Sequence, residues 1–263
     1  MISGLCCVLL LGACGLFKPS AGDKLEGERI SILGMDKSLE ADPRVADTEV
    51  VIPKPYVNPD WPQPGGYADH AMHHLALPEE LKQVWNSGAG KGMSKNTRVL
   101  ADPITDGKHA YVLDSQSGIT ALDLANGSRI WRTVLDQPGE TDFGFSIWPP
   151  NIPFMGSGNA ETPEASFGGG IAFENGRIFV SSGYGFIAAL DAETGKEIWR
   201  TPVHVPIRTA PTANGGRVFA ITQDNQLYAL AADDGRVLWT HQGLVESAGV
   251  LASAAPAVAG DTV

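Results

Sequence analysis

Hydrophobic and polar residues alternate with a period of two along much of the chain beyond residue 100. Such alternation is typical of β-strands with one buried face, and not of helices. First strands of two units are expected at 170–173 and 210–213. Second and third strands of three units are expected at 110–113 and 119–122, 178–180 and 186–190, and 218–221 and 227–230. The pattern therefore predicts an all-β fold.

Glycine-containing dipeptides separate these strands. Between the last two strands of each unit stand Asn126-Gly127, Thr194-Gly195 and Asp234-Gly235. Glycine adopts a positive φ at little cost, so tight hairpin turns are expected at Gly127, Gly195 and Gly235. Asp123 and Asp191 recur just before these turns, and we interpret them as acceptors for the turn backbone and not as an acid–base pair.

The three units share one motif, in which Ala-Leu is followed by polar residues, by glycine and, four residues later, by tryptophan. Trp199 and Trp239 are 40 residues apart, while Trp131 and Trp199 are 68 apart, which leaves an insertion of 28 residues. A period near forty with short strands predicts a β-propeller of four-stranded antiparallel blades. Because a ring repeated in every unit is a property of the repeat, we expect these tryptophans to fill the gaps between blades.

The last twelve residues, 252–263, match the opening of a further unit. About three blades plus a partial one do not close a ring, and an open propeller exposes sheet edges and blade faces. We therefore expect the incomplete propeller domain to cover residues 65–263 and the sequence to be truncated at its C-terminal end.

The first fourteen residues are an apolar stretch too short to span a bilayer, which predicts an export signal over residues 1–13. Its end, Leu11-Gly-Ala-Cys14, resembles the lipobox of bacterial lipoproteins, and this resemblance implies that Cys14 is lipidated. A plain signal or a chance apolar start are the alternatives. No Lys or Arg precedes the apolar stretch, so Met1 is not expected to be the true start.

Gly15 follows the cysteine, and the resemblance then implies sorting to the periplasmic face of the outer membrane. Cys6 and Cys7 lie in the signal, so no disulfide is expected in the exported protein. Residues 14–64, in which Pro, Lys, Asp and Glu dominate, are expected to form a lipidated tether and lead-in.

The insertion, within 138–167, carries the candidate partner contacts, which are aromatic residues interleaved with proline and glycine: Phe143, Phe145, Trp148 and Phe154. Aromatic side chains on a loop of a rigid scaffold bury a large area at low entropic cost, which suits a protein–protein contact. The alternative is a loop that folds back and caps its blade.

The composition and the spacing of the histidines argue against two kinds of ligand, nucleic acids and metal ions. The chain has 19 Lys and Arg against 30 Asp and Glu, a net charge of −11 and no basic cluster, which argues against a nucleic-acid partner. His70, His73 and His74 lie close together, but their spacing suits a metal only on a helix, so we expect a packed or surface loop and no metal site. No catalytic constellation is found.

The repeated Ala-Leu-Asp-x-x-x-Gly-x-x-x-Trp motif resembles the pyrroloquinoline-quinone-like propeller repeat. With the lipobox at Cys14, the chain resembles the BamB family, the lipoproteins of the outer-membrane β-barrel assembly machinery. Trp61–Gly66, His70–Leu75 and Leu77–Glu79 are similar to its alphaproteobacterial form. The resemblance covers residues 14–263 and implies an eight-bladed propeller, of which about half is absent here.

The resemblance also implies a function. Members of this family are non-enzymatic scaffolds or adaptors of the Bam complex that bind the periplasmic domains of BamA and help nascent outer-membrane proteins to insert, without a cofactor. One alternative is a periplasmic pyrroloquinoline-quinone-dependent dehydrogenase, whose family implies an adjacent cysteine pair beside the quinone; the only adjacent cysteines here are Cys6 and Cys7. Another alternative is a surface-binding propeller lipoprotein.

Overall fold

The computed structural model describes residues 42–44, 48–49, 51–93, 98–135, 168–244 and 254–263. The chain divides into two compact units, 1–51 and 52–263, and the second contains all the strands described below. Among the described residues, no helix is long and apolar enough to cross a membrane.

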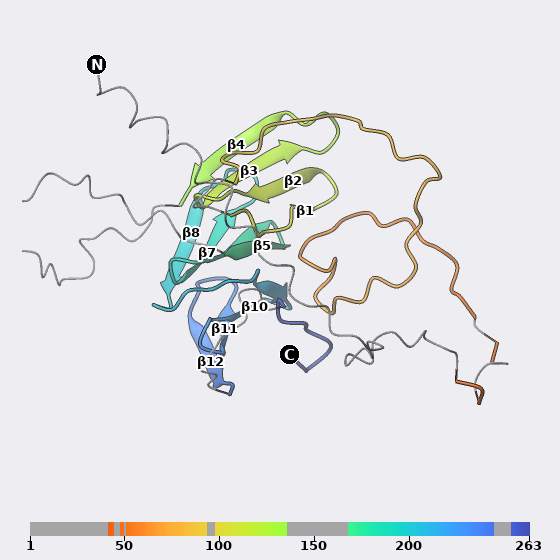
Figure 1. Cartoon of the computed structure of the whole chain (residues 1–263). Helices are drawn as coiled ribbons and strands as arrows, with labels where there is room; N and C mark the ends of the chain where they lie inside the picture. The colour runs from red at the N-terminus through yellow and green to blue at the C-terminus, as the bar shows by residue number, and fades with distance from the viewer. Residues whose placement is uncertain (1–41, 45–47, 50, 94–97, 136–167, 245–253) are drawn as a thin grey trace, which may run out of the picture. The chain divides into compact units, whose positions relative to one another are not determined.

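Three four-stranded antiparallel sheets follow one another along the chain (Figure 1). The first contains β1 (Ile104–Thr105), β2 (His109–Leu113), β3 (Gly118–Asp123) and β4 (Arg129–Val134). The second contains β5 (Gly169–Glu174), β6 (Arg177–Ser182), β7 (Phe186–Asp191) and β8 (Glu197–Pro202). The third contains β9 (Thr212–Asn214), β10 (Arg217–Ile221), β11 (Gln226–Ala231) and β12 (Val237–Gln242).

The predicted all-β fold of four-stranded antiparallel blades is confirmed, and each sheet pairs its strands in sequence order. One first strand is shorter than expected: β9 begins at Thr212 and not at residue 210. Pro211 has no N–H to give to a strand ladder, so pairing starts only after it.

The connection between the third and fourth strands is longer than the tight turn expected from the sequence. In the first sheet it covers five residues, 124–128, and the N–H of Gly127 donates a 2.8 Å hydrogen bond to the carbonyl of Asp123. Gly127, Gly195 and Gly235 have φ values of 74°, 70° and 72°, in the left-handed region that favours glycine. A β-bulge follows in each sheet, because the register shifts between the third and fourth strands.

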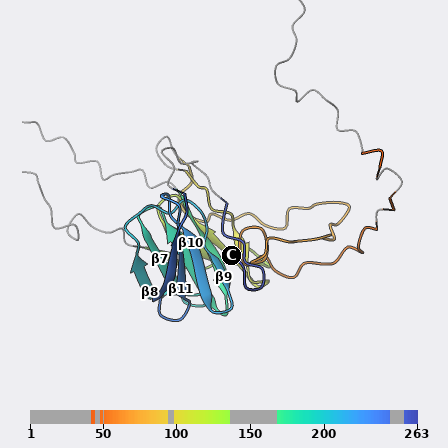
Figure 2. The same ribbon diagram turned by 90° about the horizontal axis from the view of Figure 1, so that it is seen from below.

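The hydrophobic core lies between successive sheets. One cluster joins the first and second sheets around Tyr111, Ile119 and Leu190, and another joins the second and third around Phe179, Ile187 and Val218. Figure 2 shows β7 and β8 beside β9, β10 and β11 in the neighbouring sheet. The facing sides of successive sheets are therefore buried against each other, as expected of propeller blades.

The first strands β1, β5 and β9 form what we call the inner edge, and they contact one another in sequence order. Gly170 of β5 also packs closely on the residues that precede β9, since an added Cβ there would lie 2.4 Å from the Cβ of Ala210. Because neighbouring strands are antiparallel, the turn between the first and second strands lies at the same end of each sheet as the turn between the third and fourth strands. We call this end the hairpin end. We call the opposite end the link end, because it carries the connections between sheets; the strand ends that flank 136–167 lie there.

Candidate functional site

A segment that precedes the first sheet, Trp61–Ala68, runs across the inner edge near the hairpin end, and we call it the inner-edge segment. Trp61 and Thr105 of β1 exchange two backbone hydrogen bonds of 2.9 Å. The carbonyl of Pro62 accepts a 2.7 Å bond from the N–H of Phe173 in β5. Consecutive residues of the segment therefore bind first strands of consecutive sheets.

Gln63 continues this pattern with its side chain. Its Oε1 accepts a 3.0 Å hydrogen bond from the N–H of Ala213 in β9, and its Nε2 donates a 3.2 Å bond to the carbonyl of the same residue. The residue is only 4% exposed, so both halves of the amide are satisfied away from water. Further along, the carbonyl of Ala68 accepts a 2.6 Å bond from the N–H of Val258.

The four bonded residues hold equivalent places in successive units. Thr105, Phe173 and Ala213 each pair with the second residue of the adjacent second strand. Val258 immediately precedes a new hairpin, closed by a bridge between Ala259 and Thr262. The inner-edge segment therefore meets the same backbone position four times.

Gln63 and Gly66 close a tight turn whose tip is Pro64-Gly65, with a 2.9 Å hydrogen bond from the N–H of Gly66 to the carbonyl of Gln63. Pro64 and a glycine with φ of 78° suit the two central positions of a type II turn. The ring of His70 packs on Gly65, where an added Cβ would lie 2.9 Å from Cδ2 of that ring.

His70 thus serves as packing behind the turn. Its Nε2 is buried and has no hydrogen-bond partner. His73 is exposed, and Nδ1 of His74 lies 2.7 Å from the carbonyl oxygen of Pro53. No group of three His, Cys, Asp or Glu side chains in the described part of the chain has metal-binding geometry.

A groove of about 620 Å³ lies between residues 56–73 and the inner edge. Two tyrosines in its wall are held by hydrogen bonds: Oη of Tyr56 donates to the carbonyl of Met72 at 3.0 Å, and Oη of Tyr67 lies 3.0 Å from Oδ1 of Asp60. Burial and the nearby carboxylate raise the pKa of Tyr67 above its usual value, so its phenol stays protonated as a donor at neutral pH.

The repeated tryptophans lie between sheets. Nε1 of Trp131 donates a 3.0 Å hydrogen bond to the carbonyl of Ala192 in the second sheet. The ring covers Gly195, where an added Cβ would lie 2.5 Å from Cε3. Thr133 donates through Oγ1 to the carbonyl of Gly195 at 2.7 Å. Trp199 and Thr201 make the same contacts with the third sheet.

Trp85 is a fourth member of this series, and the repeat analysis missed it. Its Nε1 donates a 2.8 Å bond to the carbonyl of Leu124, and its ring covers Gly127. The signal was present, since Lys82-Gln-Val-Trp85 resembles Lys196-Glu-Ile-Trp199. At the other end of the series, Trp239 is 42% exposed and contacts Phe219 of its own sheet.

The two recurring aspartates bind their own turns. Oδ1 of Asp123 accepts bonds from the N–H groups of Ala125 and Asn126, and Oδ1 of Asp191 accepts bonds from the N–H and hydroxyl of Thr194. The hydroxyl and backbone bonds from Thr194 lower the pKa of Asp191. Asp123 ends β3 of the first sheet and Asp191 ends β7 of the second, so each carboxylate serves the turn of its own sheet.

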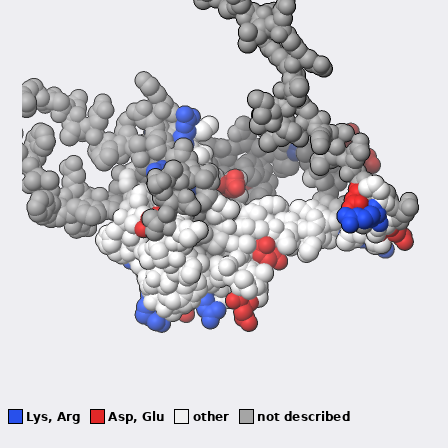
Figure 3. Space-filling view, turned by 60° about the horizontal axis from the view of Figure 1, so that its bottom comes forward, with Lys and Arg blue, Asp and Glu red and all other residues white. Residues whose placement is uncertain are grey.

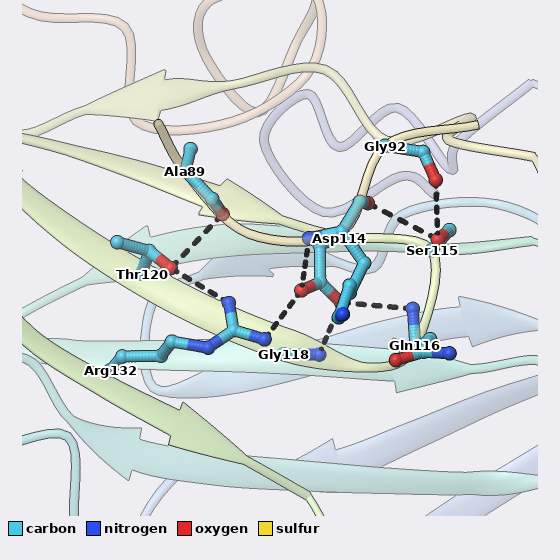
Figure 4. A network of polar contacts seen from close by, with 9 residues as sticks. Ala89, Gly92, Asp114, Ser115, Gln116, Gly118, Thr120 and Arg132 are labelled. Atoms are coloured by element: carbon cyan, nitrogen blue, oxygen red, sulfur yellow. Dashed lines mark hydrogen bonds and ion pairs between the residues drawn. The ribbon is translucent and has the colours of Figure 1, made fainter. Parts of the chain in front are cut away.

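An ion pair at the link end of the first sheet, between the buried Asp114 and the half-buried Arg132, was not predicted (Figure 4). Oδ2 of Asp114 lies 2.7 Å from Nη2 of Arg132 and accepts a 2.9 Å bond from the N–H of Lys91. Its Oδ1 accepts bonds from the N–H groups of Gln116 and Gly118. Burial acts to raise the pKa of Asp114, but the backbone bonds and the guanidinium outweigh it and lower the pKa.

This network holds the chain segment that follows Trp85. Oγ of Ser115 donates to the carbonyls of Lys91 and Gly92 at 3.1 and 2.9 Å, and Oγ1 of Thr120 donates to the carbonyl of Ala89 at 3.0 Å. The charged side chains in Figure 4 are therefore used to attach residues 89–92 to the first sheet.

Asp106, His109 and Tyr111 form a second polar cluster. Oδ2 of Asp106 lies 3.0 Å from Nδ1 of His109 and 3.0 Å from Oη of Tyr111. Burial of the phenol and the charge of Asp106 raise the pKa of Tyr111. The ring of Tyr111 is fully buried beside Trp131 and Phe173, so the cluster ties the partly exposed Asp106 and His109 to the core.

Several predicted site residues lie outside the described residues: Cys14, Phe143, Phe145, Trp148 and Phe154. On the face drawn in Figure 3, acidic and basic side chains are interspersed over a largely uncharged surface. That distribution does not resemble the continuous basic surface of a nucleic-acid-binding protein.

Successive four-stranded sheets joined by interlocking tryptophans define the class of β-propeller repeat proteins. A solved quinohemoprotein alcohol dehydrogenase from Pseudomonas putida HK5 has the same fold, with a TM-score of 0.53 and 20% identity over 71% of this chain and 27% of that one. The family described as outer membrane protein assembly factor BamB matches residues 33–146 and 148–263, and the chain belongs to this family.

Two curated relatives extend this comparison. An uncharacterized protein of Rickettsia prowazekii (strain Madrid E) is 26% identical over 168 residues, which are 64% of this chain. Outer membrane protein assembly factor BamB of Yersinia pestis is 25% identical over 177 residues, which are 67% of this chain. The chain spans 35% and 40% of the lengths of these two relatives.

Proposed function

We propose that this chain is part of a non-catalytic adaptor of the outer-membrane β-barrel assembly complex. The observation that carries the proposal is the family match, which extends over residues 33–146 and 148–263. The relative from Yersinia pestis carries the name of an outer membrane protein assembly factor. We extend that role to this chain, with the periplasmic domains of BamA and nascent outer-membrane proteins as its partners.

The contacts of the buried charges support a non-catalytic role. Asp114 is occupied by Arg132 and by three backbone N–H groups, and Asp106 by His109, Tyr111 and backbone N–H groups. A general base needs hydrogen-bond access to a substrate proton, whereas the oxygens of these carboxylates already accept hydrogen bonds from other groups of the protein. The shared fold with the alcohol dehydrogenase carries no catalytic residue to this chain, since identity is 20%.

For the location, we propose a lipid anchor on Cys14 at the periplasmic face of the outer membrane. A single acyl chain binds a membrane only marginally, whereas a lipoprotein carries several. Residues 14–64 then connect the anchor to the propeller. Their last part is more than a spacer, since Trp61 pairs with β1.

For the partner contact, we propose the insertion within 138–167 and its aromatic side chains Phe143, Phe145, Trp148 and Phe154. Its attachment points, Val134 and Gly169, both lie at the link end of the sheets. The inner-edge segment crosses near the opposite hairpin end, where Trp61 pairs with Thr105. The strands that flank the insertion therefore end away from the contact between Trp61 and Thr105.

The test uses the purified full-length protein. Immobilised periplasmic domains of BamA should retain it, and neither pyrroloquinoline quinone nor calcium should bind it in equilibrium titrations. Deletion of 143–167 should weaken retention, whereas Gln116→Ala, an exposed matched control, should not. Stoichiometric quinone binding with dye-linked alcohol oxidation would instead show a dehydrogenase, and unchanged retention of the deletion variant would show that the insertion only caps its blade.

A further inference from the structure

The first strands of a propeller present a row of backbone N–H and C=O groups towards the axis, because no further strand pairs with them there. Unpaired backbone groups must bind water, a ligand or another part of the chain. In the described sheets, the N–H groups of Thr105, Phe173 and Ala213 are all bonded to the inner-edge segment.

The bonds run in order. Trp61, Pro62 and Gln63 are consecutive, and they bind β1, β5 and β9 in turn. A strand added to a sheet binds one neighbour along its length, whereas this segment crosses from one strand to the next at each residue. It therefore lies across the inner edge and belongs to no single sheet.

The turn after these residues reaches further between the strands. Pro64 borders a cavity of about 290 Å³ whose wall also includes Gly169 and Ala210, which lie at the link end of β5 and before β9. His70 packs on Gly65 and Met72 on Gly66, so side chains of the returning segment support the turn from behind. Between the turn and these two side chains, Ala68 accepts the hydrogen bond of Val258.

We propose that residues Trp61–Ala68 form a fixed axial plug, with Gln63 as the positioning residue that locks it to β9. The plug accepts a hydrogen bond from one equivalent backbone N–H group in each of four successive units. None of these four N–H groups is then free to bind a ligand at this level of the axis. It goes beyond the adaptor proposal, since a plug is compatible with any partner on the outer surfaces.

Gln63 is suited to this position because its amide reproduces both bonds of a strand partner. It accepts from the N–H of Ala213 and donates to the carbonyl of the same residue, as a neighbouring residue in a ladder would. Alanine supplies neither group. Glutamate keeps the acceptor but loses the donor and places a carboxylate against the carbonyl of Ala213.

Hydrogen exchange of the full-length protein tests the plug. Peptides that contain Ala213 should be protected in the wild type, and Gln63→Ala should speed their exchange by about tenfold or more, which corresponds to about 1.4 kcal/mol of lost protection. Gln63→Glu should also speed their exchange, because it places a buried carboxylate against the carbonyl of Ala213. Gln116→Ala is the matched control, and exchange of β10, at 217–221, reports whether the sheet itself remains folded.

A second variant tests the plug at its turn instead of at Gln63. Gly65→Ala leaves Gln63 intact but disfavours the φ of 78° and brings a Cβ within 2.9 Å of the His70 ring. It should also speed exchange at Ala213 while β10 stays protected. Rapid exchange at Ala213 in the wild type, or protection unchanged in both variants, would overturn the plug. Neither outcome depends on whether BamA is retained.

Discussion

Nε1 of Trp199 donates a 2.9 Å hydrogen bond to the carbonyl oxygen of Ala232, which begins the turn between β11 and β12 of the next sheet. The same contact joins Trp131 to Ala192 and Trp85 to Leu124. Each indole therefore fixes the turn of the following unit by one polar bond and by packing of its ring on a glycine. The joint between blades is a repeated element of the sequence and not a set of unrelated contacts.

Truncation of that indole should weaken the joint. Trp199→Ala in the full-length protein is expected to lower the free energy of unfolding by about 3–5 kcal/mol, because a ring that is 8% exposed leaves a cavity. Trp199→Phe keeps most of the packing and should cost less. Urea denaturation measures both. A midpoint for Trp199→Ala that equals the wild-type value would show that the ring does not hold the blades together.

The glycine under the ring gives an independent test. Gly235→Ala places a Cβ 2.4 Å from Cε3 of Trp199 at a φ of +72°, so steric overlap adds to backbone strain. We expect a loss of roughly 2–4 kcal/mol in thermal or urea unfolding. Gly176→Ala is the matched control, since it has a φ of +76° and no atom within 4 Å of the added Cβ.

Gly176→Ala should therefore cost only the backbone strain, about 1 kcal/mol. In the Trp199→Ala background, the cost of Gly235→Ala should fall towards that of the control, because the ring is absent and only Oγ1 of Thr201 remains within 2.7 Å of the added Cβ. Equal costs of the two glycine substitutions in the wild-type background would argue against a close ring–glycine contact.

The ion pair of Asp114 and Arg132 should make stability depend on pH. The pKa of Asp114 is lowered in the folded state, so its contribution is present above the unfolded value of about 3.9 and is lost as pH falls through the folded pKa. Asp114→Asn should cost roughly 1.5–3 kcal/mol at pH 7. The difference in stability between wild type and Asp114→Asn should shrink at acid pH, because a protonated Asp114 is as neutral as asparagine.

Urea unfolding between pH 7 and the lowest pH at which both proteins fold measures this difference. Glu80→Gln is the control, since Glu80 pairs with Lys82 at 3.3 Å while both side chains remain more than three-quarters exposed. It should change stability little at any pH. A gap between wild type and Asp114→Asn that stays constant with pH would mean that the charge of Asp114 is not what holds the network.

The anchor is tested by fractionation of cells. Cys14→Ala should move the protein from the membrane fraction to the soluble periplasm, because the acyl chains would no longer be attached. Cys6→Ala is the control, since that residue lies in the segment expected to be removed. If Cys14→Ala stays with membranes as firmly as the control, anchoring through this cysteine is excluded.

The strands and their order were predictable because their signals are local. Period-two alternation reports which side chains face the core, and a glycine such as Gly195 reports a positive φ in its own turn. The interblade position of Trp131 and Trp199 followed from repetition alone. Trp85 was missed because Leu81 stands four residues before it, where the other three tryptophans have a glycine.

Contacts between distant segments could not be predicted in this way. Gln63 binds Ala213 across 150 residues of sequence, and nothing near either residue marks the other. The pairing exists because folding brings three first strands to one edge, where their N–H groups need acceptors. Likewise, the charge of Asp114 gains its importance from burial beside Arg132. Local sequence thus specifies blades and turns, whereas convergence of the packed blades creates the plug and the buried ion pair.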